Sequence, residues 1–266
     1  MPKVKNLIAA LPEPETIDID ALRQQLADGS VDLVCVLGPT ASGKTRYAVR
    51  LARSLGNAEI ISADSRQVYR RMDIGTGKDL AEYGDVPYHL IDIAEPGTQY
   101  NVYRFQQDFR KAYEDIRSRG HVPILCGGTG LYISAVTGAY DFKEKKALSA
   151  VPREPAADAP KTFFIGTLVS REVRNARIDA RLDTRLEEGM TDEIQSLLDE
   201  GVPAPVLISY GLEYKFVTLY LTGQVDYAWM REHLAIAIHQ FAKRQMTWFR
   251  GMERSGVIIH WVDPSA

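Results

Sequence analysis

This sequence of 266 residues has only two cysteines, no long apolar run and no large excess of charge of either sign. No stretch is apolar enough to span a bilayer, and prolines and acids interrupt the short apolar patch at the start of the chain, which makes it a poor signal peptide. The two cysteines, Cys35 and Cys126, lie in apolar runs, so buried free thiols are favoured over a disulfide. A cytoplasmic protein is therefore expected.

The charge balance also limits the classes of partner. A formal net charge of −3 gives no overall sign of a nucleic-acid-binding protein, although a local basic face can exist within a balanced total. The hydrophobic content of 45% and the charged content of 25% are ordinary for a globular domain. One sizeable domain with a small helical addition is expected from this length.

Apolar runs alternate with amphipathic stretches along the chain, which predicts a parallel sheet flanked by helices. Strands are expected at 31–38, 58–62, 88–96, 122–128, 162–169 and 257–262. Helices are expected at 19–27, 45–56, 103–120, 171–200, 210–222 and 227–251. The predicted organisation is a lead-in (1–30), a core (31–139), a linker (140–161) and a strand plus helical part that completes the core (162–266).

A phosphate-binding loop (residues 38–45) lies between the first predicted strand and the helix that follows it. Its sequence fits G-x-x-x-x-G-K-[ST] at every fixed position. Backbone N–H groups and the positive end of the helix converge there on an anion. The residues expected to bind a diphosphate or triphosphate are Gly38, Pro39, Thr40, Ala41, Ser42, Gly43, Lys44 and Thr45. The fold class is therefore α/β of the P-loop NTPase type, with a helical C-terminal half.

Two further segments follow predicted strands at the same edge of the sheet. Asp64 comes directly after the second strand, where its carboxylate can hold Mg²⁺ through water or accept a proton, and also cap a helix. Thr129 follows the fourth strand in a glycine-rich turn and can aim its hydroxyl into the same crevice. Beside Asp64 stands a polar, basic cluster that comprises Arg66, Gln67, Arg70 and Arg71.

Together these segments resemble a known family. The sequence GPTASGKT, then EIISADSRQVYRRMDIGTGK, VPYHLIDI and PILCGGTGLYISAV closely resemble the tRNA dimethylallyltransferases, also called tRNA isopentenyltransferases. SREVRNARIDARLDTRLEEGMTDEIQSLLDEG and FAKRQMTWFR look like the C-terminal signatures of that family. The resemblance covers about 31–138 and 162–262, which is most of the chain.

The resemblance implies a defined chemistry. The phosphate loop would hold the diphosphate of dimethylallyl diphosphate with Mg²⁺, and the exocyclic amine of an adenine next to the tRNA anticodon would displace that diphosphate. Asp64 would be the general base, Thr45 would coordinate Mg²⁺, and Lys44 would neutralise the leaving group. Thr129 would contact the diphosphate or nucleotide, and Arg177 would reach the diphosphate, with Arg181 in reserve. The implied RNA-binding residues are Asp64, Ser65, Arg66, Gln67, Lys243, Arg244 and Gln245. A monomer is expected.

The stretch 140–161 departs from the family pattern. The family usually carries a helical insert of dozens of residues at this place, which helps to grip the anticodon stem, and here the insert is missing or much reduced. A free adenine nucleotide therefore stays open as an alternative acceptor to tRNA. Two other classes also stay open: a binding protein without turnover, and a small-molecule kinase whose lid would carry Arg174, Arg177, Arg181 and Arg185.

Overall fold

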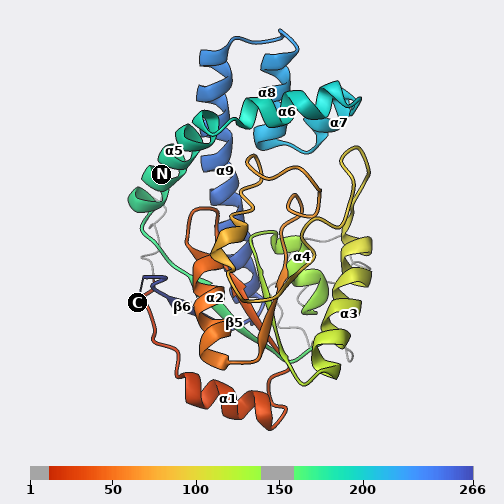
Figure 1. The fold of residues 1–266 in the computed structure, drawn as a ribbon. Coiled ribbons are helices and arrows are strands. Elements are labelled where there is room, and N and C mark those ends of the chain that lie inside the picture. The colour runs from red at the N-terminus through yellow and green to blue at the C-terminus, as the bar shows by residue number, and fades with distance from the viewer. Residues whose placement is uncertain (1–11, 139–158, 266) are drawn as a thin grey trace.

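The described residues form one parallel sheet of six strands (Figure 1). The computed structural model describes residues 12–138 and 159–265 of the chain. The strands are β1 (Leu33–Leu37), β2 (Ala58–Ser62), β3 (Tyr88–His89), β4 (Val122–Gly127), β5 (Thr162–Thr167) and β6 (Ile259–Val262). Their order is β3-β2-β4-β1-β5-β6, and all neighbours are parallel. All carboxyl ends therefore lie at one edge of the sheet, as the predicted fold class requires.

Two clusters of buried residues cover the two faces of this sheet. Residues of β1 alternate between them, because successive side chains of a strand point to opposite faces: Val34 and Val36 belong to one cluster, Cys35 and Leu37 to the other. The helices on the first face are α1 (Ile19–Ala27) and α2 (Lys44–Leu55), and those on the second are α3 (Val102–Ser118) and α4 (Gly130–Val136). Both cysteines are free and buried, as predicted.

The C-terminal half is helical, as predicted, and most of it gathers beyond one end of the sheet (Figure 1). Its shorter helices are α5 (Arg171–Glu187), α6 (Met190–Asp199), α7 (Ala204–Ser209) and α8 (Leu212–Leu221). The long helix α9 (Tyr227–Arg254) extends from this group down to the sheet. It buries Met230 and Leu234 in its first half and Phe249 and Met252 in its second half. One helix thus contributes to both parts of the molecule.

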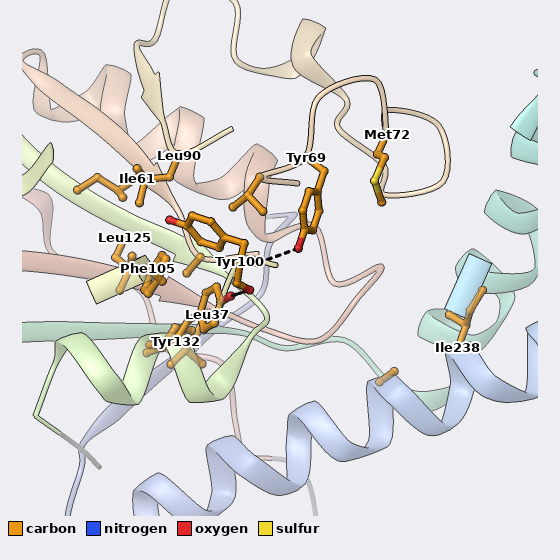
Figure 2. Packing of buried hydrophobic residues seen from close by; sticks show 14 of the residues in the cluster. Leu37, Ile61, Tyr69, Met72, Leu90, Tyr100, Phe105, Leu125, Tyr132 and Ile238 are labelled. Carbon is orange, nitrogen blue, oxygen red and sulfur yellow. Dashed lines mark hydrogen bonds between the residues drawn. The ribbon is translucent and has the colours of Figure 1, made fainter. Parts of the chain in front are cut away.

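Aromatic side chains connect the segment after β2 to the second face of the sheet (Figure 2). The hydroxyl of Tyr69 accepts a hydrogen bond from the N–H of Tyr100 at 3.1 Å, and the hydroxyl of Tyr132 donates to the Tyr100 carbonyl at 3.3 Å. The ring of Tyr132 stacks on Phe105 with centroids 4.2 Å apart. Buried hydroxyl groups need such partners, and here they fix the chain between β3 and α3.

Two predicted elements differ from the structure. The strand expected over 88–96 is wrong beyond His89, because Leu90 (φ 63°) and Asp92 (φ 56°) adopt left-handed backbone conformations that end an extended strand. The helix expected over 171–200 is interrupted at Gly189, whose φ of 98° separates α5 from α6. Helices α4 and α7 were not predicted as separate elements. Most of the expected linker, residues 140–158, lies outside the described residues.

Candidate active site

The phosphate loop connects β1 to α2 and leaves the start of α2 open. Gly43 precedes α2 with φ 81° and provides no side-chain cap, so the first N–H groups of the helix have no side-chain acceptor from the cap residue. Lys44 lies at the first turn, and its Nζ is 3.4 Å from the Pro39 carbonyl. Burial lowers the pKa of Lys44, and the carboxylate of Asp64 opposes that change. These features are typical of a site for a phosphate anion.

The back of the loop is tied to the rest of the protein by two polar side chains. The Ser42 hydroxyl lies 2.6 Å from the Thr167 hydroxyl at the end of β5, so it is used inside the protein. Gln245 on α9 accepts a hydrogen bond from the Thr40 N–H at 2.8 Å and donates to the Gly128 carbonyl at 2.9 Å. Gln245, which the resemblance assigned to RNA binding, is thus a buried bridge between the loop and the turn after β4.

Asp64 stands at the carboxyl end of β2 and faces the loop across a cleft. Its Oδ1 accepts a hydrogen bond from the Arg66 N–H at 3.0 Å. The Asp64 side chain lines the same cleft as Lys44 and Thr45. The structure therefore brings together the predicted base, the predicted cation and the predicted magnesium ligand.

Thr129 lies beside the Asp64 loop. Its N–H donates to the Ala63 carbonyl, and its Oγ1 accepts from the Ser65 N–H, each at 3.2 Å. Gly127 permits this approach, since a Cβ there would lie 2.3 Å from the Ala63 carbonyl oxygen. Thr129 thus holds the turn that carries Asp64, and it does not itself line the cleft.

The arginines of α5 separate into two groups. Arg181 and Arg185 line the cleft, whereas Arg177, one helical turn earlier, is exposed and lies outside the lining. Arg181 forms an ion pair with Asp79. The predicted pair of Arg177 and Arg181 is thus divided, and Arg185 takes a place in the cleft that the sequence suggested only for a kinase-like lid. The regular spacing of four residues from Arg177 through Arg181 to Arg185 was the available signal.

A buried carboxylate that the sequence did not single out completes the cleft wall. Glu213 on α8 forms an ion pair with Arg66, and its Oε1 lies 3.8 Å from Nη1 of Arg185. The exposed fractions of the Arg66 and Glu213 side chains are 14% and 4%. Burial opposes the charge of Arg66, but the carboxylates of Glu213 and Asp64 raise its pKa overall.

The remaining residues assigned to RNA binding lie around the cleft or on α9. Gln67 accepts from the Ser62 hydroxyl and donates to the Gly77 carbonyl, each at 3.2 Å. Lys243 and Arg244 are exposed on α9, and the Arg244 guanidinium lies 5.9 Å from the ring centre of Phe241, which itself lines the cleft. These two cations are free to meet a polyanion at the rim of the site.

The donor groups in the cleft suit a magnesium ion that arrives with a phosphate. Within residues 12–138 and 159–265, no group of three or more His, Cys, Asp or Glu side chains could hold a metal. Thr45 and Asp64 supply one hydroxyl and one carboxylate at the cleft. Mg²⁺ usually takes one or two protein ligands beside substrate phosphates and water, so this sparse set fits it.

Comparison with known proteins decides the family. A model of the IPP transferase family matches residues 67–158 and 141–252, and an isopentenyl transferase model matches 31–83. The tRNA dimethylallyltransferase 1 of Parabacteroides distasonis is 47% identical over 88% of this chain and 93% of its own length. The enzyme of that name from Porphyromonas gingivalis is 48% identical over 87% and 93%. The chain belongs to the tRNA dimethylallyltransferase family.

Solved structures agree with this assignment. The tRNA isopentenylpyrophosphate transferase of Bacillus halodurans matches with a TM-score of 0.75 and 32% identity, over 88% of this chain and 90% of the other. The corresponding transferase of Staphylococcus epidermidis matches with a TM-score of 0.74 and 30% identity, over 88% and 93%. The chain is thus a P-loop prenyltransferase that acts in tRNA processing. The small-molecule kinase and the binding protein without turnover are set aside.

The comparisons also concern the length of the chain and the stretch 140–161. The alignment with the tRNA dimethylallyltransferase 1 of Parabacteroides distasonis extends over 286 residues, more than the 266 of this chain. That relative therefore contains residues without counterparts here. The two matches to the IPP transferase model overlap at 141–158, within the stretch where the sequence predicts the reduced insert.

Among the described helices, none has the length and apolar character that crossing a membrane requires.

Proposed function

We propose that this chain transfers the dimethylallyl group of dimethylallyl diphosphate to the exocyclic N6 amine of an adenosine next to the tRNA anticodon. One observation carries the proposal: Lys44, Thr45 and Asp64 line one cleft at the carboxyl edge of the sheet. A cation, a metal-binding hydroxyl and a carboxylate in one place serve a reaction in which diphosphate leaves and an amine loses a proton.

In the proposed reaction, the N6 nitrogen attacks the allylic carbon and forms a C–N bond. The C–O bond to the diphosphate breaks, and the electron pair leaves with the diphosphate. Lys44, the N–H groups of the phosphate loop, and Arg181 stabilise the charge that develops there, which lowers the barrier because it grows in the transition state. Arg177, which is exposed and outside the cleft lining, lies one helical turn before Arg181 on α5.

The proton of the attacking amine goes to Asp64. An adenine amine is a weak nucleophile, so a carboxylate within reach accelerates the attack. Thr129 and Ser65 keep the Asp64 turn in place through their hydrogen bond. The adenine must leave its stack to reach this depth, at a cost of a few kcal/mol that contacts with the protein offset.

Thr45 and Asp64 are the residues that would hold Mg²⁺, Asp64 through a water molecule. When bound, the ion neutralises charge on the diphosphate and makes it a better leaving group.

The proposed RNA contacts surround the cleft. Ser65, Arg66 and Gln67 lie on the turn after β2 and would meet the flipped nucleotide. Lys243 and Arg244 are exposed and would meet phosphates of the anticodon stem. We further infer that the protein is a monomer and that it is cytoplasmic. A cytoplasmic location fits both the tRNA acceptor and the free thiols of Cys35 and Cys126.

The test is one reaction with labelled dimethylallyl diphosphate and two acceptors, an anticodon stem-loop and AMP. We expect label in the stem-loop and none in AMP. Label in AMP alone would show a free adenine nucleotide as the acceptor. The absence of label in both, with tight ATP binding measured by calorimetry, would reject the transferase.

A further inference from the structure

The cleft carries more positive than negative side chains. Its lining contains four cationic side chains and two carboxylates, which are Lys44, Arg66, Arg181, Arg185, Asp64 and Glu213. Such a surplus, largely removed from water, favours an anionic ligand. The four cations differ in how closely a negatively charged or polar group contacts them.

Three of the cations have a close partner. Arg66 forms an ion pair with Glu213, Arg181 forms one with Asp79, and Lys44 contacts the carbonyl of the phosphate loop. Arg185 differs from them. Only 12% of its side chain is exposed, and its one ion pair among the described residues, with Glu213, is long at 3.8 Å, beyond hydrogen-bonding distance. Within the described part of the chain, no hydrogen bond from Arg185 is found.

Glu213 cannot neutralise both arginines that it faces. Its other oxygen already contacts Arg66, and the side chain of Glu213 is only 4% exposed. Burial and the adjacent charge of Arg181 lower the pKa of Arg185 to about 10. A guanidinium pKa ordinarily lies far above this range, and the carboxylates of Glu213 and Asp79 only partly offset the effect of burial.

The loop opposite α5 is shaped to hold this cation in the cleft. At Gly77, an added Cβ would lie 1.6 Å from Nη2 of Arg185 and 2.6 Å from Nη2 of Arg181. The missing side chain of Gly77 thus leaves the space that both guanidinium groups occupy. Arg181 and Arg185 are one helical turn apart, so their guanidinium groups stand next to each other at the wall of the cleft.

We propose that Arg185 is a further ligand of the diphosphate, and that Glu213 holds it in position until the diphosphate arrives. The inference rests on the proposed function, because it needs a diphosphate in the phosphate loop. The planar guanidinium fork suits two phosphate oxygens at once, and only a long contact with Glu213 has to be given up. The leaving diphosphate then supplies the close negative partner that Arg185 lacks in the free protein.

The experiment measures the affinity of the full-length protein for inorganic diphosphate with Mg²⁺ by calorimetry. We expect Arg185→Gln to lose about tenfold or more in affinity, and Arg185→Lys to lose less, because a charge-assisted bidentate contact becomes a single one or none. The matched control is Arg231→Gln. Arg231 pairs with Asp183 of α5 outside the cleft lining, and its loss should leave the affinity unchanged.

Binding of an unmodified anticodon stem-loop is the readout that a purely structural role would change. We expect Arg185→Gln to keep this affinity within about twofold. Unchanged diphosphate affinity in Arg185→Gln, or an equal loss for diphosphate and stem-loop, would overturn the inference. If Arg185→Gln does not fold, unchanged diphosphate affinity in both Arg185→Lys and Arg185→Ala would overturn the inference. Failure of the unaltered protein to bind diphosphate would instead overturn the proposed function.

Discussion

At the scale of single residues, Asp64 is positioned to accept a proton. Its Oδ1 is occupied by the Arg66 N–H, while no described residue donates a hydrogen bond to Oδ2. The carboxylate is thus oriented by one oxygen and available through the other. Lys44 and Arg66 line the same cleft.

This arrangement predicts the outcome of Asp64→Ala. Turnover should fall by about 10²–10⁴-fold, the usual contribution of a positioned general base, while the dissociation constant of dimethylallyl diphosphate changes little. Steady-state kinetics and calorimetry measure the two quantities. Asp85→Ala, which removes an exposed partner of Arg53, is the control and should leave both unchanged. A comparable loss of donor affinity in Asp64→Ala would identify Asp64 as a metal-site residue instead.

At the scale of elements, the start of β2 is fastened to the end of α3 by one carboxylate. Glu59 is 3% exposed as a side chain and accepts from Arg119, from His89 Nε2 at 2.7 Å and from His121 Nδ1 at 2.5 Å. The hydrogen bond from Arg119, followed by those from the two histidines, lowers the pKa of Glu59 to about 2. This cluster lies at the amino end of the strand, away from the cleft.

The lowered pKa predicts a window of acid sensitivity. A carboxylate with a depressed pKa stabilises the fold fully above its unfolded pKa near 4.5, and this stability is lost as the pH falls from there towards 2. The contribution is of the order of 3 kcal/mol. Denaturant unfolding of the unaltered protein and Glu59→Gln at several pH values measures it. The difference between the two should shrink below pH 4.5, and a constant difference would contradict the assignment. Glu187→Gln, at an exposed site on α5, is the control.

Local patterns predicted most of the elements and part of the site. The phosphate loop and Asp64 were found because each directly follows an apolar run, so short-range order alone places them at the sheet edge. Glu213 and the bridging role of Gln245 were missed, since Gln245 meets Thr40 across 205 residues and no local pattern encodes its partner. The early end of β3 has a related cause, because Asp92 leaves the extended conformation and pairs with buried Lys78.

At the scale of the whole molecule, a carboxylate of α6, Glu193, makes one of the connections between the helical half and the loop after β2. Glu193 accepts hydrogen bonds from the N–H groups of Asp73 and Ile74 at 2.7 Å and of Gly75 at 3.1 Å. It also accepts from the hydroxyl of Tyr214, a fully buried residue of α8, at 2.7 Å. The same loop continues to Gly77 at the cleft, so this contact orders one wall of the active site.

Removal of this carboxylate should loosen the loop without unfolding the sheet. In Glu193→Gln, we expect the amides of residues 73–75 to exchange with solvent about tenfold faster or more, since hydrogen bonds to a charged acceptor contribute about 1.5–3 kcal/mol. Amides of β1 and β4 should keep their rates. Hydrogen exchange followed by mass spectrometry or NMR measures both. Tyr214→Phe, which keeps the three backbone bonds, should have a smaller effect. Equal acceleration throughout the sheet would show that Glu193 supports global stability instead.

The late position of α9 in the chain has a consequence for synthesis. Ribosomes deliver β1 and β4 long before Phe249 and Met252, yet these residues belong to the same buried cluster as Leu37 and Leu125. With 28 residues, α9 is about 42 Å long and reaches both halves. Until α9 has emerged, the cluster on this face has α3 and α4 but lacks Phe249 and Met252, so part of it stays open to water. A nascent chain in that state is prone to aggregation, which makes it a natural client for chaperones.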